Sequence, residues 1–150
     1  MSRTFLWPQG YTSAAMISVN LDAEFYGRIF YPGIDVSEGD IQRLGWTGME
    51  YGLPHLLDCF REHGVKGTFF IPGRVAELYP DAVRAIADAG HELGCHGYEH
   101  EILAHFTPEE QLELLKKAKA AIEKAAGRAV TGFRMPEGEI TEQTLVAAKE

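Results

Sequence analysis

Residues 65–96 read VKGTFFIPGRVAELYPDAVRAIADAGHELGCH, and this stretch decides the fold class. It opens with a short apolar run, continues through a helical pattern, and closes with a second short apolar run. Pro80 stands near the start of the helical pattern and Gly90 follows its end, which are typical positions for these residues at helix boundaries. A strand, a helix and a strand in this order predict a parallel βαβ unit.

The same alternation continues on both sides of this unit. The other predicted elements are a strand at 13–22, a helix at 49–64, a helix at 107–127, a strand at 129–136 and a helix that starts near 141. Residues 22–48 have no clear period and contain several glycines, so we expect a long loop there. Successive βα units predict an α/β protein with a parallel sheet and right-handed crossovers.

Composition and charge exclude several classes of partner. The chain has 150 residues, of which 45% are hydrophobic, so we expect one globular domain. Its net charge of −8 argues against nucleic acid and against an anionic membrane surface, because both require clustered Lys and Arg. No apolar run approaches the roughly 20 residues that span a bilayer.

The cysteines and the first residues predict a cytoplasmic protein. Cys59 and Cys95 lie far apart and neither belongs to a CxxC motif, which fits a reducing compartment. The opening residues, MSRTFLWPQG, show no basic segment followed by an apolar one, so we expect no signal peptide.

Reactive side chains follow three of the predicted strands. Asn20, Asp22 and Glu24 alternate at the end of the first strand, so extended backbone would place all three on one face. His96 and His100 lie at the end of the third predicted strand, and Arg134 lies at the end of the fourth. The carboxyl ends of parallel strands share one edge of a sheet, where α/β proteins place their active sites, so we expect these groups to converge.

Asp22, His96 and His100 are candidate metal ligands. The two histidines are four residues apart, so a helical turn between them would let both reach one ion. This spacing alone is weak evidence, since the polarity of a surface loop explains most instances of it. Two imidazoles and one carboxylate form a common open site for a divalent transition metal, which activates water and polarises a carbonyl oxygen. The histidines without such a context are expected to be structural or exposed: His55, His63, His91 and His105.

Four motifs follow one another along the chain. They are SVNLDAEF at 18–25, GVKGTFFIPG at 64–73, AGHELGCHGYEHE at 89–101 and TGFRMPEG at 131–138. In this order they resemble the polysaccharide deacetylase (NodB-homology, carbohydrate esterase 4) superfamily, and in particular its intracellular branch that acts on small amides. The resemblance implies a distorted (β/α) barrel and a hydrolase that removes acetyl groups or opens related cyclic amides.

The resemblance also implies roles for individual residues. Asp22, His96 and His100 would hold a divalent metal, usually Zn²⁺, and Arg134 would orient an acidic catalytic residue. The catalytic base of the family is an aspartate two residues before the metal aspartate, and here that position is Asn20. An amide cannot accept a proton at neutral pH. Three alternatives stay open: Glu24 replaces the base, the activated water acts with another group, or hydrolysis is impaired.

The length of the chain departs from the resemblance as well. Four predicted strands cannot close a barrel that resembles one of seven or eight strands. We therefore expect residues 1–150 to be the N-terminal part of a single NodB-like deacetylase domain, about its first half, completed by a missing C-terminal half or by homo-oligomerisation.

The sequence leaves three functions open. The first is a metal-dependent hydrolase of non-peptide C–N bonds in a small-molecule amide, imide or acetylated sugar. Glu137 stands where many sugar deacetylases carry an aromatic residue, which favours the small amides within this group. The second is a non-catalytic or subunit-forming metal-binding domain, and the third is a metal-free hydrolase of the allantoinase type.

Overall fold

A four-stranded parallel sheet forms the centre of the molecule in a computed structural model that describes residues 7–25 and 37–150. The strands are β1 Ser18–Asn20, β2 Thr68–Ile71, β3 Glu92–Cys95 and β4 Gly132–Phe133. Their order in the sheet is β1-β2-β3-β4, so neighbours along the chain are neighbours in the sheet. This order is that of a (β/α) barrel rather than of a doubly wound sheet, and it confirms the predicted parallel α/β fold.

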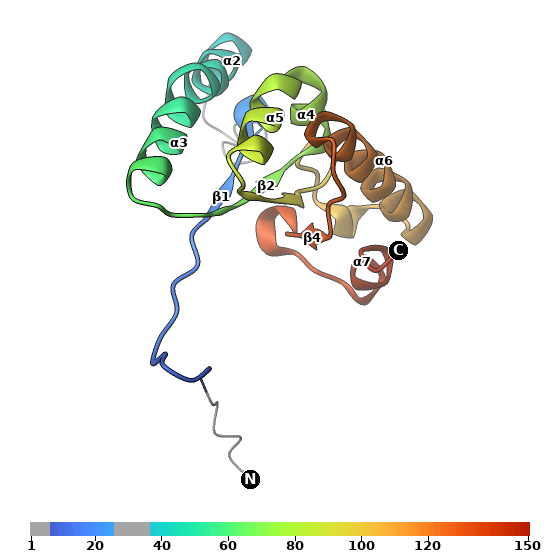
Figure 1. The fold of residues 1–150 in the computed structure, drawn as a ribbon. Coiled ribbons are helices and arrows are strands. Elements are labelled where there is room, and N and C mark those ends of the chain that lie inside the picture. The colour runs from blue at the N-terminus through green and yellow to red at the C-terminus, as the bar shows by residue number, and fades with distance from the viewer. Residues whose placement is uncertain (1–6, 26–36) are drawn as a thin grey trace.

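Helices follow the strands and cover the sheet (Figure 1). The helices and helical turns are, in chain order, η1 Ala23–Phe25, α2 Glu38–Thr47, η2 Gly48–Gly52, α3 Leu53–Glu62, α4 Gly73–Leu78, α5 Pro80–Asp88, η3 Leu103–His105, α6 Pro108–Ala126, η4 Pro136–Gly138 and α7 Glu142–Ala147. The predicted helices at 49–64, 107–127 and near 141 are confirmed as α3, α6 and α7. Thr107 and Glu110 form the capping box that starts α6.

The two faces of the sheet have different environments. In β2, Phe69 and Ile71 are fully buried in the core beneath the helices. Thr68 and Phe70 lie on the opposite face because side chains alternate along a strand. The register aligns a row of residues on this second face: Asn20, Phe70, Gly94 and Gly132.

The register also brings the ends of the strands to one edge. The backbone N–H of His96 donates to the carbonyl of Ile71, and that of Arg134 donates to the carbonyl of Cys95. These bonds continue the sheet ladder by one residue beyond β3 and β4. Asp22, His96 and Arg134 each lie two residues beyond a member of the aligned row, so all three emerge at the same edge.

The prediction of a loop over residues 22–48 is wrong for residues 38–47, which form α2. Ser37 caps this helix by accepting a hydrogen bond from the backbone N–H of Asp40, which is a common start signal. The glycines in this range suggested a loop, but Gly45 instead lets α2 pack closely against the backbone of Ala23 and Glu24. A Cβ on Gly45 would lie 2.4 Å from the backbone nitrogen of Glu24. Residues 26–36 of the predicted loop lie outside the described residues.

The first strand is shorter than the predicted range of 13–22. Residues 18–20 pair with β2, and the ladder extends by one bond on each side: the Ile17 carbonyl accepts from the backbone N–H of Thr68, and the backbone N–H of Leu21 donates to the carbonyl of Phe70. Residues 13–17 are exposed. Figure 1 shows the described segment before β1 running away from the helical layer. Without a neighbouring strand, an extended segment has no ladder to join.

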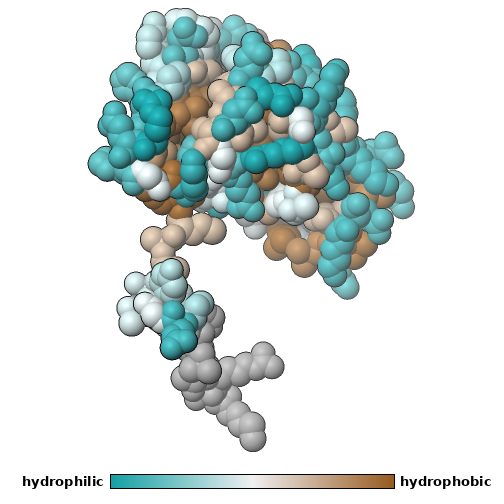
Figure 2. All heavy atoms as spheres, viewed as in Figure 1, coloured by the Kyte–Doolittle hydropathy of each residue, from teal (hydrophilic) through white to brown (hydrophobic). Residues whose placement is uncertain are grey.

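The surface is polar over most of the helical layer, whereas apolar side chains gather at the α7 end of the molecule (Figure 2). The exposed apolar residues there are Ile140, Leu145 and Val146. Among the described residues, no helix combines the length and apolar character that crossing a bilayer requires.

Replacing Gly73 with alanine is expected to destabilise the fold by about 1–3 kcal/mol, because the new methyl group would overpack the contact between α4 and α6. A Cβ on Gly73 would lie 2.5 Å from the Cα of Ala118 and 2.8 Å from the Tyr98 ring. Urea unfolding followed by circular dichroism measures the change. Gly52→Ala is the matched control, because Gly52 is helical with φ −64° and has open space around its Cβ position. We expect this control to be neutral or stabilising, and equal effects of both variants would contradict the packing role.

Candidate metal centre

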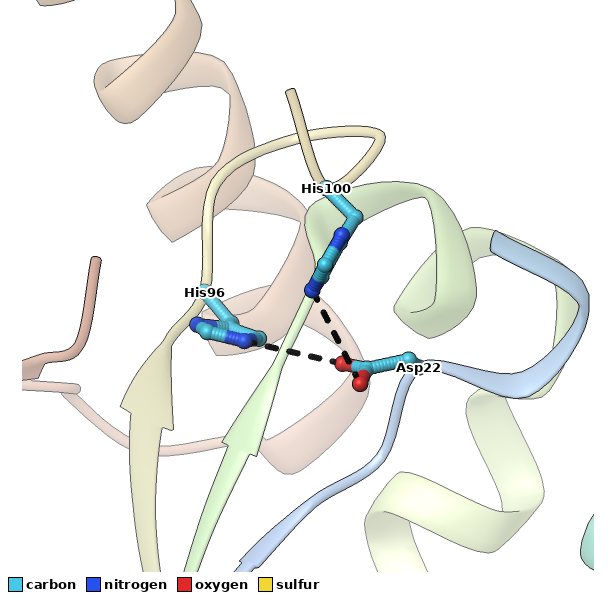
Figure 3. A group of neighbouring side chains, drawn as sticks. All are labelled: Asp22, His96 and His100. Atoms are coloured by element: carbon cyan, nitrogen blue, oxygen red, sulfur yellow. Dashed lines mark ion pairs between the residues drawn. The ribbon is translucent and has the colours of Figure 1, made fainter. Parts of the chain in front are cut away.

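Asp22, His96 and His100 meet at the carboxyl edge of the sheet (Figure 3). One potential ligand atom from each residue lies within 4.8 Å of the others. His96 Nε2 is 3.7 Å from Asp22 Oδ1, and His100 Nε2 is 3.8 Å from Asp22 Oδ2. All three residues are buried, with exposed fractions of 8%, 1% and 2% in chain order. The three candidate ligands predicted from the sequence therefore form one compact cluster.

The strand ends and the loop after β3 place these side chains. Asp22 lies two residues after β1, and His96 follows β3 directly. The two histidines come together without a helical turn between them. Instead, the chain folds back through two residues with positive φ, Gly97 at 73° and His100 at 62°. This loop brings both imidazoles to the carboxylate of Asp22.

Backbone strain is concentrated at this centre. Among the non-glycine residues that the structure describes, positive φ occurs at Ala23, His100 and Glu137. Ala23 follows Asp22, His100 is a candidate ligand, and Glu137 lies beside His100. Left-handed backbone is uncommon for these residue types, and it persists where surrounding structure and function require it.

The protonation of His96 favours a cation between the three residues. His96 Nδ1 lies 2.8 Å from the backbone carbonyl of Arg134, which can only accept, so Nδ1 carries the proton. Burial lowers the pKa of His96 to about 4, so the ring is neutral at pH 7. Its Nε2 lone pair therefore faces the carboxylate of Asp22.

A cation would also stabilise the ionised form of the Asp22 carboxylate. Burial raises its pKa, and the negative charge of Glu137 raises it further against the opposing effects of His100 and Arg134. Asp22 Oδ1 and His96 Nε2 are both buried, and neither has a hydrogen-bond partner among the described residues. Burying two polar atoms without a hydrogen-bond partner is costly. A divalent metal would satisfy both, so the residues present fit such an ion.

Arg134 contacts the residue at the position of the catalytic base. Its Nη1 donates to Asn20 Oδ1 at 2.7 Å, its Nη2 donates to Ser18 Oγ at 2.8 Å, and its guanidinium lies 4.0 Å from the centre of the Phe70 ring. Because arginine only donates, the Asn20 oxygen must face it. The amide NH₂ of Asn20 is thereby directed away from Arg134.

The structure separates Glu24 from this arrangement. The extended backbone that would place Glu24 on the face of Asn20 and Asp22 ends at Ala23, where φ is 47° and η1 begins. The condition for a shared face, extended backbone as far as Glu24, is therefore not met. Glu24 Oε2 instead accepts a hydrogen bond of 3.2 Å from the Tyr79 hydroxyl.

The histidines outside the candidate site have structural or exposed positions. His91 is buried, and its Nδ1 accepts a hydrogen bond from the backbone N–H of Gly67. The remaining three are exposed: His55, His63 and His105. Cys59 and Cys95 are both free cysteines.

Glu137 is a residue at the site that sequence reasoning did not place there. Its Oε1 lies 3.6 Å from His100 Nδ1, and its side chain is 15% exposed. The available signal was its position three residues after Arg134, at the same edge of the sheet. Nothing in the local sequence indicates that its carboxylate faces a histidine from another strand.

Known proteins resemble this chain in sequence and in fold. A sequence model of the family described as polysaccharide deacetylase matches residues 46–150. The chain belongs to the polysaccharide deacetylase family. A peptidoglycan deacetylase from Helicobacter pylori is 38% identical over 106 residues, which cover 71% of this chain and 36% of that protein. A presumed polysaccharide deacetylase from Mycobacterium smegmatis has a crystal structure that matches with a TM-score of 0.86 and 32% identity, over 96% of this chain and 50% of that one.

Some structures similar to this chain are of a protein described as a pseudoenzyme. A carbohydrate esterase 4 pseudoenzyme from Bacillus anthracis is 25% identical, with a TM-score of 0.68, over 89% of this chain and 39% of that one. A mutant of that pseudoenzyme with restored activity is 33% identical, with a TM-score of 0.65, over 68% of this chain and 37% of that one.

This member of the polysaccharide deacetylase family spans only part of the length of its relatives. It spans about a third of the Helicobacter pylori relative and half of the Mycobacterium smegmatis structure. Its four parallel strands therefore correspond to part of a larger α/β fold, as expected for a partial (β/α) barrel.

Proposed function

We propose that this chain carries the metal centre of a hydrolase that cleaves a non-peptide C–N bond, with an acetamido group of an amino sugar as the leading substrate group. The observation that carries the proposal is the cluster of Asp22, His96 and His100, whose buried lone pairs converge at the carboxyl edge of the sheet. The name of the Helicobacter pylori relative supports an acetylated sugar as the substrate. Small amides and cyclic imides are the alternative substrates, favoured by Glu137 in place of an aromatic residue.

Each residue of the centre has a distinct task in this proposal. Asp22, His96 and His100 would hold the ion, for which Zn²⁺ suits the donor set. When bound, such an ion supplies Lewis-acid polarisation of the acyl oxygen and activation of water. Arg134 holds the oxygen of Asn20, so Asn20 presents N–H groups to a ligand. Asn20 can therefore orient an acyl oxygen or a water molecule, but it cannot accept the proton that hydrolysis releases.

A metal-binding domain without hydrolytic activity is the second candidate. Its support is Asn20 at the position of the catalytic base, together with the existence of a pseudoenzyme among similar structures. A homo-oligomeric state and a cytoplasmic location stay predictions, which light scattering and cell fractionation test.

The test uses the chain purified without chelator. Release of acetate from N-acetylglucosamine oligomers, and opening of hydantoins and cyclic imides, are measured before chelation, after EDTA, and after addition of Zn²⁺. We expect acetate release that EDTA abolishes and Zn²⁺ restores. His96→Ala should remove the Zn²⁺-dependent rate, whereas His55→Ala, at an exposed histidine, should retain it.

The remaining outcomes separate the alternatives. Zn²⁺ binding without turnover of any substrate would favour the non-catalytic domain. Opening of cyclic imides without acetate release would assign the small-amide class. Full turnover after exhaustive chelation would contradict the metal-dependent proposal and support a metal-free hydrolase.

A further inference from the structure

The two candidate histidine ligands differ in the partner of their second ring nitrogen. His96 Nδ1 donates to the backbone carbonyl of Arg134. His100 Nδ1 has no hydrogen-bond partner within 3.5 Å among the described residues, and it is buried. The group that faces it is the carboxylate of Glu137, at 3.6 Å. His100 therefore has Asp22 at one ring nitrogen and Glu137 at the other.

The turn η4, which contains Glu137, packs against the loop that joins the two histidines. Pro136, the residue before it, is buried, and Glu137 itself has φ 58° and ψ −2°. A Cβ on Gly97 would lie 3.1 Å from Pro136 Cγ, so η4 packs closely against the loop that joins the histidines. The carboxylate of Glu101 accepts from the backbone N–H groups of two residues in that loop, Tyr98 and Glu99, and so fixes its backbone. Glu101 thus holds the backbone of the loop, while Glu137 faces the imidazole.

A carboxylate in this position has a defined chemical effect. A neutral imidazole carries one proton, and the hydrogen bond made by one nitrogen decides which nitrogen can bind a metal. Histidine ligands generally donate their other N–H to a carboxylate, carbonyl or water, and loss of that partner typically weakens metal binding by about 10–100-fold.

We propose that Glu137 is a positioning residue of the metal centre: it accepts the Nδ1 proton of His100, so that Nε2 is presented unprotonated beside Asp22. This inference rests on the proposed function, because it assigns Glu137 to the same metal site. His96 obtains the equivalent support from a main-chain carbonyl. The position after the Arg-Met-Pro motif therefore contributes to metal affinity in this chain through its side chain.

Zinc affinity is the quantity that tests this role. The dissociation constant of Zn²⁺ is measured by competition with a chromophoric chelator for the wild-type chain, Glu137→Ala, Glu137→Gln and Glu139→Ala. We expect Glu137→Ala to weaken Zn²⁺ binding by about 10–100-fold. Glu137→Gln should weaken Zn²⁺ binding less than Glu137→Ala does, because the amide oxygen of glutamine still accepts the Nδ1 proton of His100. Glu139→Ala is the matched control, since Glu139 is exposed and lies two residues further along, and its affinity should equal that of the wild type.

Two further measurements separate positioning from general stability. Thermal unfolding in EDTA should give similar midpoints for the wild type and for the Glu137 variants. The visible absorption of the Co²⁺-loaded chain should change in Glu137→Ala and stay close to that of the wild type in Glu137→Gln.

The outcomes distinguish this inference from the proposed function. If the wild type binds Zn²⁺ and Glu137→Ala binds it equally well, the positioning role is wrong and the proposed function stands. An equal loss in Glu139→Ala, or an equal loss in Glu137→Gln and Glu137→Ala, would also overturn the positioning role. If the wild type binds no Zn²⁺, the proposed function fails and this role fails with it.

Discussion

Asn20→Asp is expected to raise the rate of Zn²⁺-dependent acetate release by about 10²–10⁴-fold, because a positioned general base contributes about that much. The substitution keeps the shape of the side chain and supplies a group that can accept a proton. Arg134 would hold the new carboxylate, since its Nη1 already lies 2.7 Å from Asn20 Oδ1. A nearby guanidinium also favours the ionised form of a carboxyl, which a base requires.

The measurement is kcat/KM of the Zn²⁺-loaded Asn20→Asp variant on N-acetylglucosamine oligomers, compared with that of the wild type. Asn20→Ala is the control that alters the same position without adding a base, and we expect no increase from it. A rate for Asn20→Asp equal to that of the wild type would contradict the assignment of this position to the base. If Glu24→Gln abolished wild-type turnover instead, Glu24 would be the base despite its hydrogen bond to Tyr79.

Asp22→Asn is expected to have opposite effects on metal binding and on the stability of the metal-free chain. Zn²⁺ affinity should fall by more than the roughly 10–100-fold typical of a partner outside the ligand set, because the variant loses an anionic ligand. The metal-free variant should nevertheless unfold at a higher temperature than the wild type at pH 7. Burial raises the pKa of Asp22, so its ionised form is disfavoured in the folded state, and a neutral amide avoids that cost.

The pH dependence follows from the direction of this shift. A carboxyl whose pKa is raised on folding contributes stability that is present below its unfolded pKa, about 3.9, and is lost as pH rises through the folded pKa. The difference in unfolding temperature between Asp22→Asn and the wild type in EDTA should therefore shrink as pH is lowered towards 4. Scanning calorimetry in EDTA and in excess Zn²⁺ measures both effects, and the order of stability should reverse when Zn²⁺ is added. A metal-free Asp22→Asn chain less stable than the wild type at pH 7 would contradict this account of the buried carboxylate.

The sequence predicted those parts of the site that depend on regular secondary structure. Asp22 and His96 could be placed together because both follow parallel strands, whose carboxyl ends lie at one edge of a sheet. The helix at 107–127 could be placed because its capping box is a local signal, formed by Thr107 and Glu110.

The features that the sequence did not predict depend on contacts between distant segments. Gly45 suggested a loop, but its role is to let α2 approach the backbone of Glu24. The left-handed backbone of Ala23 and His100 has no local signal, because neither position carries glycine, the residue that adopts this conformation readily. For the same reason the sequence could not show that the extended backbone ends before Glu24, or that a loop without a helical turn joins the two histidines. The approach of Glu137 to His100 likewise depends on how η4 packs against the loop after β3.

The central claim is that Asp22, His96 and His100 bind one divalent ion. Anomalous diffraction at the zinc absorption edge, from crystals of the Zn²⁺-loaded chain, tests this claim most directly. We expect one strong anomalous peak, bonded to a carboxylate oxygen of Asp22 and to the Nε2 atoms of His96 and His100. A Zn²⁺-loaded crystal without a peak between these side chains, or with its bound zinc held elsewhere, would contradict it.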